Sequence, residues 1–248
     1  MGSRGKKIRQ SEKEFIADGI QSVREALSPS FPDAPELINL YVTEKGYGKL
    51  QEEISAEVLD KAPIIHVSDS VMNEMAETES PQGILALCKF TEITLYKIKQ
   101  REVKRIAYFW EIQDPGNSGT VIRTAEALGF DAVIFSKNSV DVYSPKTVRA
   151  TVGALWHIPV VEGVEIEDLI EFASEGDFFT VALAGNGEGT ILEVPKSEKE
   201  ILIFGNEARG LPEIPGLGAR VAIPMKGKSE SLNVASAAAI AMFEVGIR

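Results

Sequence analysis

The chain has 248 residues, of which 44% are hydrophobic and 25% are charged, and its formal net charge at pH 7 is −11. These values are typical of a soluble globular protein with one large or two modest domains, and they exclude a fibrous or wholly disordered chain. The acidic charge argues against a protein that binds nucleic acid by bulk attraction alone. No apolar run reaches the roughly 20 residues of a membrane helix, and no apolar stretch follows the basic start. We therefore expect no membrane span, no signal peptide and a cytoplasmic protein.

Side chains that commonly bind metals are few. His66 and His157 lie far apart in the sequence, and Cys88 is the single cysteine. An internal disulfide is therefore excluded, and we expect no metal. Cys88 lies within an apolar segment, which favours a core position over a hydrolase nucleophile.

The N-terminal region alternates helix and strand patterns. Apolar residues recur at helical spacing over 11–27, and Ser11 with Glu14 resembles a capping box, which predicts a helix there. Further helices are predicted up to Asp60 and over 68–77, and strands are predicted at 37–42, 62–67 and 83–90. We expect a small α/β domain over 1–95 and a linker rich in Lys and Arg over 96–105.

The C-terminal region repeats this alternation. The predicted strands are 105–112, 131–135, 157–161, 177–184, 201–205 and 219–224. The predicted helices are 120–130, 144–155, 165–176 and 231–245, and 114–119 is predicted as a loop. Short apolar strands separated by helices predict a mostly parallel sheet, covered on both faces, over 106–248.

Ligands of such sheets bind beyond the carboxyl ends of the strands, so the segments that follow strands are the informative ones. The first such segment places Asn117 and Gly119 at a helix start, where free backbone N–H groups favour an anion, with Arg123 about one turn further on. An Asn-Gly turn beside a surface arginine explains the same residues. FGNEARGLP (204–212) is either a site or an ion-paired turn at a strand end.

Two glycine-containing segments leave nucleotide motifs incomplete. In AGNGEG (184–189), Thr190 stands where a dinucleotide fingerprint requires its last glycine. Near GKS (227–229), Ala222 stands where a P-loop requires its first glycine. A nucleotide-binding enzyme of either type is therefore a weaker interpretation. Ser229, Ser231 and Asn233 form either part of a site or a capping segment for the Ala-rich helix that follows.

Taken in order, these segments resemble the three signature motifs of the SpoU/TrmH-type RNA 2′-O-methyltransferases of the SPOUT superfamily. The motifs are similar to NSGTVIRTAEALGF (117–130), LIFGNEARGLP (202–212) and IPMKGKSESLNVASAAAIAMFE (223–244). Less specifically, FIADGIQSVREAL (15–27) and SPQGILAL (80–87) resemble the substrate-binding module that these enzymes often carry, which is related to kink-turn-binding ribosomal proteins.

The resemblance implies an α/β fold with a C-terminal trefoil knot, S-adenosylmethionine as methyl donor, and a homodimer with active sites near its interface. It implies methylation of a ribose 2′-hydroxyl in structured RNA, with ribosomal RNA expected and transfer RNA as the alternative. DNA lacks that hydroxyl and is not an expected partner. The family's catalytic positions match Asn117, Arg123, Glu207, Ser231 and Asn233, and its cofactor-binding positions match Ala184, Gly185, Gly205, Ile223 and Leu232.

The resemblance also suggests a division of labour among the polar positions. A guanidinium remains protonated, so Arg123 is a poor proton acceptor. As a hypothesis, Arg123 stabilises developing alkoxide charge or enlists an RNA phosphate oxygen as acceptor, while Glu207 and Asn117 hold it. Ser231 and Asn233 would then orient the ribose. The competing interpretation is a non-catalytic RNA- or ribosome-binding protein that retains the fold, and the intact polar positions weigh against it.

Overall fold

The computed structural model describes residues 2–78, 80–228 and 231–246, which group into two compact units. The first unit contains the residues up to 91 together with 141–157, and the second contains 92–140 and the residues from 158 onward. The domain ranges predicted from the sequence place 141–157 in the second domain, whereas the structure groups this segment with the first unit. Within the described ranges, no helix has both the length and the apolar character to cross a membrane.

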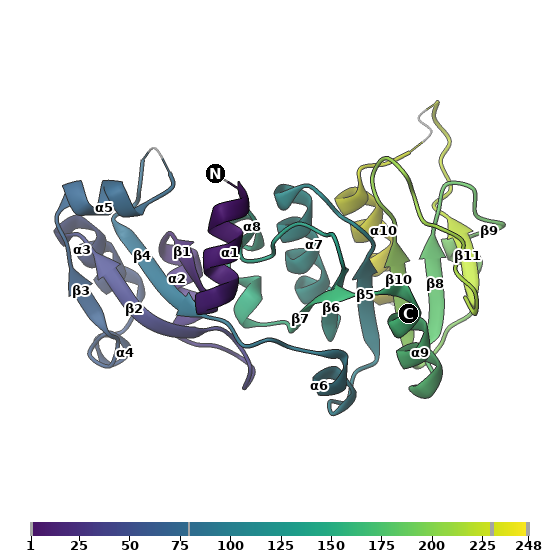
Figure 1. The fold of residues 1–248 in the computed structure, drawn as a ribbon, viewed down its shortest axis with the longest axis horizontal. Coiled ribbons are helices and arrows are strands. Elements are labelled where there is room, and N and C mark those ends of the chain that lie inside the picture. The colour runs from purple at the N-terminus through teal and green to yellow at the C-terminus, as the bar shows by residue number, and fades with distance from the viewer. Residues whose placement is uncertain (1, 79, 229–230, 247–248) are drawn as a thin grey trace. The chain divides into compact units, whose positions relative to one another are not determined.

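The first unit is built on a four-stranded sheet with the order β1-β4-β2-β3 (Figure 1). β1 and β2 are antiparallel to β4, and β3 is parallel to β2. The strands are β1 (Glu14–Asp18), β2 (Glu36–Val42), β3 (Ile64–His66) and β4 (Ile84–Lys89). The helices are α1 (Gly2–Glu12), α2 (Ile20–Ala26), α3 (Glu44–Glu53), α4 (Ala56–Leu59), α5 (Asp69–Met75) and α8 (Pro145–Thr151), with a 3-10 turn at Ala154–Trp156.

The single helix predicted over 11–27 is wrong. Its first part is β1, in which Phe15 and Ala17 are buried while the residues between and beside them are partly exposed. The same apolar positions therefore satisfy the two-residue period of a strand, and pairing with β4 decides the outcome. Gly19, with a φ of 93°, separates β1 from α2. Ser11 lies in α1 and donates its hydroxyl to the carbonyl of Ile8 rather than capping a new helix.

The segment 141–157 supplies much of the aromatic core of the first unit. Tyr143 stacks on Phe90, with ring centroids 4.1 Å apart, and it also contacts Phe15 at 5.0 Å. Trp156 is fully buried, and its indole nitrogen donates to the carbonyl of Pro35 at 3.0 Å. Such contacts bury large aromatic surfaces, so this segment belongs to the core that stabilises the first unit.

The second unit is built on a seven-stranded parallel sheet with the order β7-β6-β5-β10-β8-β11-β9. All five residues of β6 and of β10 are buried, so both faces of the sheet are covered, as the sequence predicted. The strands are β5 (Arg105–Phe109), β6 (Ala132–Ser136), β7 (Val160–Val164), β8 (Phe179–Leu183), β9 (Gly189–Thr190), β10 (Glu200–Phe204) and β11 (Ala219–Ala222). The helices are α6 (Leu95–Lys99), α7 (Pro115–Ala127), α9 (Ile166–Glu175) and α10 (Val234–Gly246), with a 3-10 turn at Ile191–Glu193.

Helices α7 and α10 run side by side in the same direction. At their N-terminal ends, the side chain of Asn233 donates to that of Asn117 at 3.0 Å. At their C-terminal ends, a Cβ atom on Gly246 would lie only 3.2 Å from the carbonyl oxygen of Leu128. The parallel arrangement places both N-terminal ends at the carboxyl edge of the sheet, because α7 follows the end of β5.

Candidate active site

A cavity of about 440 Å³ opens at the carboxyl ends of β8, β10 and β11. Each of the five residues predicted to hold a cofactor lines it, namely Ala184, Gly185, Gly205, Ile223 and Leu232. Glu207 and Ser231, from the predicted catalytic set, line the same cavity. Segments that lie far apart in the sequence therefore converge at one place, where parallel α/β sheets commonly bind ligands.

The loop that follows β10 is folded tightly back on itself. Asn206 and Gly210 exchange two backbone hydrogen bonds, at 3.1 and 2.9 Å. A Cβ atom on Gly205 would lie 2.5 Å from the carbonyl carbon of Gly210, so a residue without a side chain is required there. The oxygen of the Asn206 side chain accepts from the backbone N–H groups of Ala208 and Arg209, at 3.0 and 3.1 Å. The loop is therefore held in a defined geometry by its own hydrogen bonds where it lines the cavity.

Three predicted catalytic residues form one hydrogen-bonded cluster. Asn117 comes from the first turn of α7, Glu207 from the loop after β10, and Asn233 from the residue before α10. The Nδ2 atom of Asn117 donates to Oε1 of Glu207 at 3.1 Å, and Oδ1 of Asn117 accepts from Nδ2 of Asn233 at 3.0 Å. Asn117 is therefore the central member of the cluster, with its amide oriented by both neighbours.

Helix capping fixes this cluster in place. The side chain of Asn233 accepts from the N–H groups of Ala235 and Ser236 at the start of α10, at 2.9 and 3.3 Å. At the start of α7, Oδ1 of Asp114 accepts from the N–H of Asn117 at 2.8 Å. Capping of this kind satisfies donors that helix starts otherwise leave unpaired.

These caps correct two predictions about the start of α7. The predicted loop over 114–119 is wrong, because α7 begins at Pro115, a residue well suited to the first turn. The predicted free donors are also wrong, because the N–H of Asn117 is bound by a carboxylate and Gly119 is buried within the helix. A negative charge already occupies this helix end, which disfavours phosphate there.

The structure does not bring Arg123 to the cluster. Arg123 is exposed on α7 and does not line the cavity. It follows Asn117 by six residues, which places the two side chains about 120° apart around the helix axis. Within the described chain, no hydrogen bond or ion pair joins Arg123 to Glu207 or Asn117. Ser231 is exposed where it lines the cavity, and Ser229 lies outside the described residues.

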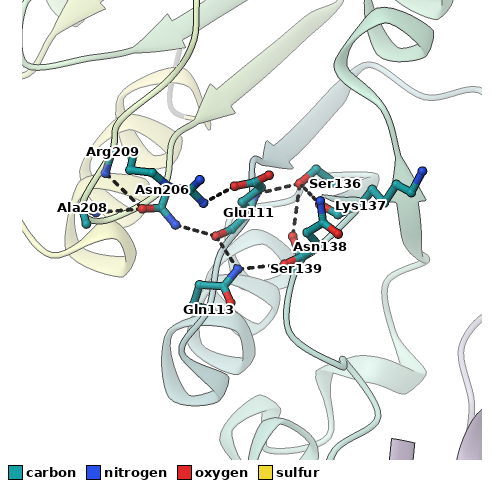
Figure 2. A network of polar contacts seen from close by, with 9 residues as sticks. All are labelled: Glu111, Gln113, Ser136, Lys137, Asn138, Ser139, Asn206, Ala208 and Arg209. Atoms are coloured by element: carbon teal, nitrogen blue, oxygen red, sulfur yellow. Dashed lines mark hydrogen bonds and ion pairs between the residues drawn. The ribbon is translucent and has the colours of Figure 1, made fainter. Parts of the chain in front are cut away.

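Sequence reasoning missed one residue next to this site, Glu111. Figure 2 shows it at the centre of a polar network after β5, where its carboxylate pairs with the guanidinium of Arg209. FGNEARGLP (204–212) is thus both an ion-paired turn and part of the cavity lining, so the two interpretations of its sequence are compatible. No sequence pattern marks Glu111, because it falls within a predicted strand and belongs to no motif. Its backbone conformation in the structure is what sets it apart.

The cavity suits a ligand with apolar and polar parts. Phe204, Val234 and Ala237 give apolar surface, while Asn206, Glu207 and Arg209 bring polar side chains to the lining. Among the described residues, no group of three or more His, Cys, Asp or Glu side chains is arranged to hold a metal ion. A nucleoside-like molecule with a polar tail, such as S-adenosylmethionine, fits this donor set and this volume.

Together, the fold and the cavity define an α/β protein with a small-molecule site at the carboxyl ends of parallel strands. Residues 104–243 match the SpoU rRNA methylase family, and residues 4–86 match the MRM3-like substrate binding domain. The chain belongs to the SpoU rRNA methylase family.

Relatives that span nearly the whole chain are similar to it in sequence. The 23S rRNA (guanosine(2553)-2′-O)-methyltransferase RlmP of Bacillus subtilis is 31% identical over 97% of this chain and 91% of its own length. The 23S rRNA (uridine(2479)-2′-O)-methyltransferase of Streptomyces viridochromogenes is 28% identical over 98% and 85%. The crystal structure of an AdoMet-bound rRNA methyltransferase from Sinorhizobium meliloti matches with a TM-score of 0.82 and 28% identity, over 97% of this chain and 89% of that one.

Proposed function

We propose that the protein transfers the methyl group of S-adenosylmethionine to a ribose 2′-hydroxyl of ribosomal RNA. The observation that carries this proposal is the convergence of the cluster Asn117, Glu207 and Asn233 on a cavity lined by every residue predicted to hold the cofactor. The two whole-length relatives are named for ribosomal RNA, which favours that target over transfer RNA.

When bound, S-adenosylmethionine supplies an electrophilic methyl group on a positively charged sulfur. In the proposed transfer, the 2′-oxygen would bond to that methyl carbon while the carbon–sulfur bond breaks with its electron pair going to sulfur, and the hydroxyl proton would pass to a phosphate oxygen of the RNA. Holding the two reactants in line replaces a large entropic barrier, with effective molarities on the order of 10⁵ M or more. The turns at 184–185 and 205–210 and the side chain of Ser231 line the cavity. These turns would hold the cofactor, and Asn233 and Ser231 would orient the ribose.

Arg123 serves the RNA side of the reaction. Its guanidinium holds a phosphate oxygen that accepts the hydroxyl proton, and its charge stabilises the developing alkoxide. Within one chain Arg123 lies outside the cavity lining, and it is proposed to reach the cavity of a second chain.

A homodimer through α7 and α10 meets this requirement. Two large apolar side chains of α10 are exposed, Ile240 at 44% and Phe243 at 53%. On the neighbouring α7, Thr120, Arg123 and Ala127 are exposed along one stripe. Exposed apolar side chains that recur along a helix favour association, and a two-fold interface would place Arg123 of each chain against its partner.

Mixing two inactive variants tests this arrangement. Arg123→Ala and Glu207→Ala proteins, each inactive alone, should recover about a quarter of wild-type activity after co-refolding, because half of the statistical dimers contain one complete site. Absence of recovery, with mixed dimers demonstrated by native mass spectrometry, would place Arg123 in the site of its own chain.

Other parts of the sequence-based interpretation remain proposals. The trefoil knot is supported by the position of β10, which follows β8 in the chain yet lies between β5 and β8 in the sheet. The N-terminal domain over 1–95 is proposed to select the RNA, which the match of 4–86 to a substrate binding domain supports. The basic linker over 96–105, the methyltransferase domain over 106–248 and the cytoplasmic location stay predictions.

Methyl transfer to defined RNAs tests the proposed function. Purified protein, S-[methyl-³H]adenosylmethionine and either 23S rRNA, large ribosomal subunits or total tRNA are incubated, and 2′-O-methyl positions are mapped in any labelled RNA. We expect label in 23S rRNA or large subunits at one ribose, and none with an Asn117→Ala, Glu207→Ala double variant. Label confined to tRNA, or cofactor binding with no labelled RNA, would contradict the proposal.

A further inference from the structure

Glu111 has an unusual backbone conformation next to the cavity. Its φ of 48° lies in the left-handed region, which side-chain-bearing residues rarely adopt because the Cβ atom crowds the following peptide. Such a conformation persists only where surrounding contacts over-determine it, and residues of this kind cluster at functional sites. Its contacts therefore indicate what the conformation serves.

Every polar group of Glu111 has a partner. Its N–H donates to the hydroxyl of Ser136 at 2.7 Å, and its carbonyl accepts from the side chains of Gln113 and Asn206, at 3.0 and 2.8 Å. Its carboxylate pairs with the guanidinium of Arg209. Figure 2 shows these contacts reaching from the end of β5 to the end of β6 on one side and to the loop after β10 on the other.

The loop after β10 is thus attached to the end of β5 at two points. Asn206 is the first, because its side chain donates to the carbonyl of Glu111 while its oxygen accepts from Ala208 and Arg209. The ion pair of Arg209 with Glu111 is the second, and the guanidinium also lies 5.5 Å from the centre of the Trp110 ring. Glu207 stands between these two points, where it meets Asn117.

We propose that the Glu111–Arg209 ion pair is a positioning device that fixes the loop 205–211, so that the loop closes the cofactor cavity and Glu207 keeps its hydrogen bond to Asn117. This inference rests on the proposed function of the cavity as a cofactor site. Neither residue needs to touch the reacting atoms. The left-handed backbone of Glu111 aims its carboxylate at the loop, which explains why the conformation is kept.

The expected size of the effect follows from exposure. The side chain of Arg209 is 62% exposed and that of Glu111 is 16% exposed, so the pair is partly screened by water. Removing the carboxylate charge should therefore loosen the loop without unfolding the unit. We expect the dissociation constant of S-adenosylmethionine to rise about two- to fivefold.

Two variants separate the ion pair from the backbone conformation. Glu111→Gln keeps the side-chain length but removes the charge. Glu111→Asn introduces the side-chain-bearing residue that best tolerates the left-handed region, and this residue is uncharged and shorter. If the ion pair positions the loop, both variants should bind the cofactor more weakly. The unfolding temperature should fall little in Glu111→Gln and not at all in Glu111→Asn. Wild-type affinity in Glu111→Asn would assign the residue a purely structural role and overturn the proposal.

Substitutions of Arg209 give an independent series of variants. Arg209→Lys retains the charge, so its cofactor affinity should lie between wild type and Arg209→Gln. The double variant Glu111→Gln, Arg209→Gln should bind no more weakly than the worse single variant, because both changes remove the same pair. Additive losses would show that the two side chains act separately and would overturn the proposal.

Amide hydrogen exchange of the cofactor-free protein supplies a readout that does not depend on methyl transfer. Glu111→Gln should raise exchange in a peptide covering 205–211 and leave a peptide covering β10 unchanged. The matched control is Glu175→Gln, which breaks the exposed Lys99–Glu175 pair of the same unit and should change neither exchange nor affinity. If no variant binds S-adenosylmethionine, including wild type, the proposed function fails, while the exchange data still test the ion pair. Unchanged exchange in the 205–211 peptide of Glu111→Gln would overturn the proposal that the ion pair positions the loop.

Discussion

Replacing Asn117 by aspartate tests the polar cluster more sharply than alanine does. Aspartate has nearly the same shape and can still accept from Asn233, but it cannot donate to Glu207. Instead, it places a second carboxylate about 3 Å from the first, at the distance now spanned by the Asn117–Glu207 hydrogen bond of 3.1 Å. If the cluster orients the substrate, Asn117→Asp should be more damaging than Asn117→Ala.

The structure allows both effects to be sized. Alanine loses one hydrogen bond to a charged group and one between neutral groups, together about 2 kcal/mol at a half-exposed position, or roughly 30-fold in kcat/KM. Two carboxylates about 3 Å apart repel by about 5 kcal/mol at an effective dielectric constant near 20, and water at the cavity mouth screens this to about 1–2 kcal/mol. Together with the lost hydrogen bond, this repulsion should cost Asn117→Asp about 3 kcal/mol of transition-state stabilisation, which lowers kcat/KM roughly 150-fold.

The pH dependence provides a second criterion. Two adjacent carboxylates raise the pKa of one of them, because the shared proton relieves their repulsion. Below that raised pKa the pair holds a proton that can restore the lost hydrogen bond, so the deficit of Asn117→Asp should shrink as the pH falls. The assay is single-turnover methyl transfer as a function of pH, with S-adenosylmethionine affinity measured in parallel and Glu175→Gln, which breaks an exposed ion pair elsewhere in the unit, as control. The reasoning is refuted if aspartate is as active as alanine, or if its deficit is independent of pH.

Three further predictions concern glycines and the buried thiol. Gly205→Ala should weaken S-adenosylmethionine binding at least tenfold by titration calorimetry, because its Cβ would lie 2.5 Å from the carbonyl carbon of Gly210; near-normal affinity would contradict the tight turn. Gly46→Ala should destabilise the first unit by about 2–3 kcal/mol in urea unfolding, because its Cβ would lie 1.9 Å from the carbonyl oxygen of Gly83, whereas Gly48→Ala, with open space around it, should gain up to about 1 kcal/mol. Equal unfolding free energies for Gly46→Ala and Gly48→Ala would be inconsistent with the close packing of Gly46 against Gly83. Burial raises the pKa of Cys88 from 9.0 to about 12, so iodoacetamide at pH 8 should label it only after unfolding, and folding stability should decline above about pH 9, where the unfolded thiol ionises first. Rapid labelling of the folded protein would refute this.

Much of the second unit could be predicted because its signals are local. Each parallel strand is a short apolar run, and each cofactor-lining segment contains a glycine or follows a strand end, so spacing and burial agree. The convergence of Asn117, Glu207 and Asn233 came from the family resemblance, since nothing in their spacing specifies a distance of 3 Å. Family motifs thus supplied the long-range information that periodicity lacks.

The errors arose where long-range pairing overrode a local pattern. Phe15 fits both a helix and a strand, and only its register opposite Cys88 in β4 decides between them. Residues 141–157 lie inside the predicted second domain, yet Tyr143 and Trp156 pack with aromatic and backbone groups of the first unit. The neighbouring sequence identifies neither the strand that pairs with Phe15 nor the groups that pack against 141–157.

Glu207 links the two halves of the candidate site. The proposed cofactor half consists mainly of turns and apolar side chains, whereas the proposed substrate half consists of amide and carboxylate side chains held by helix caps. Glu207 belongs to both, because it lines the cavity and accepts from Asn117. Changes in Asn117 should therefore act on the methyl-transfer step and spare cofactor affinity. Changes in Glu111 or Arg209 move the loop that contains Glu207 and should affect both quantities. This difference in kinetic signature distinguishes a residue that contacts the substrate from one that positions the loop.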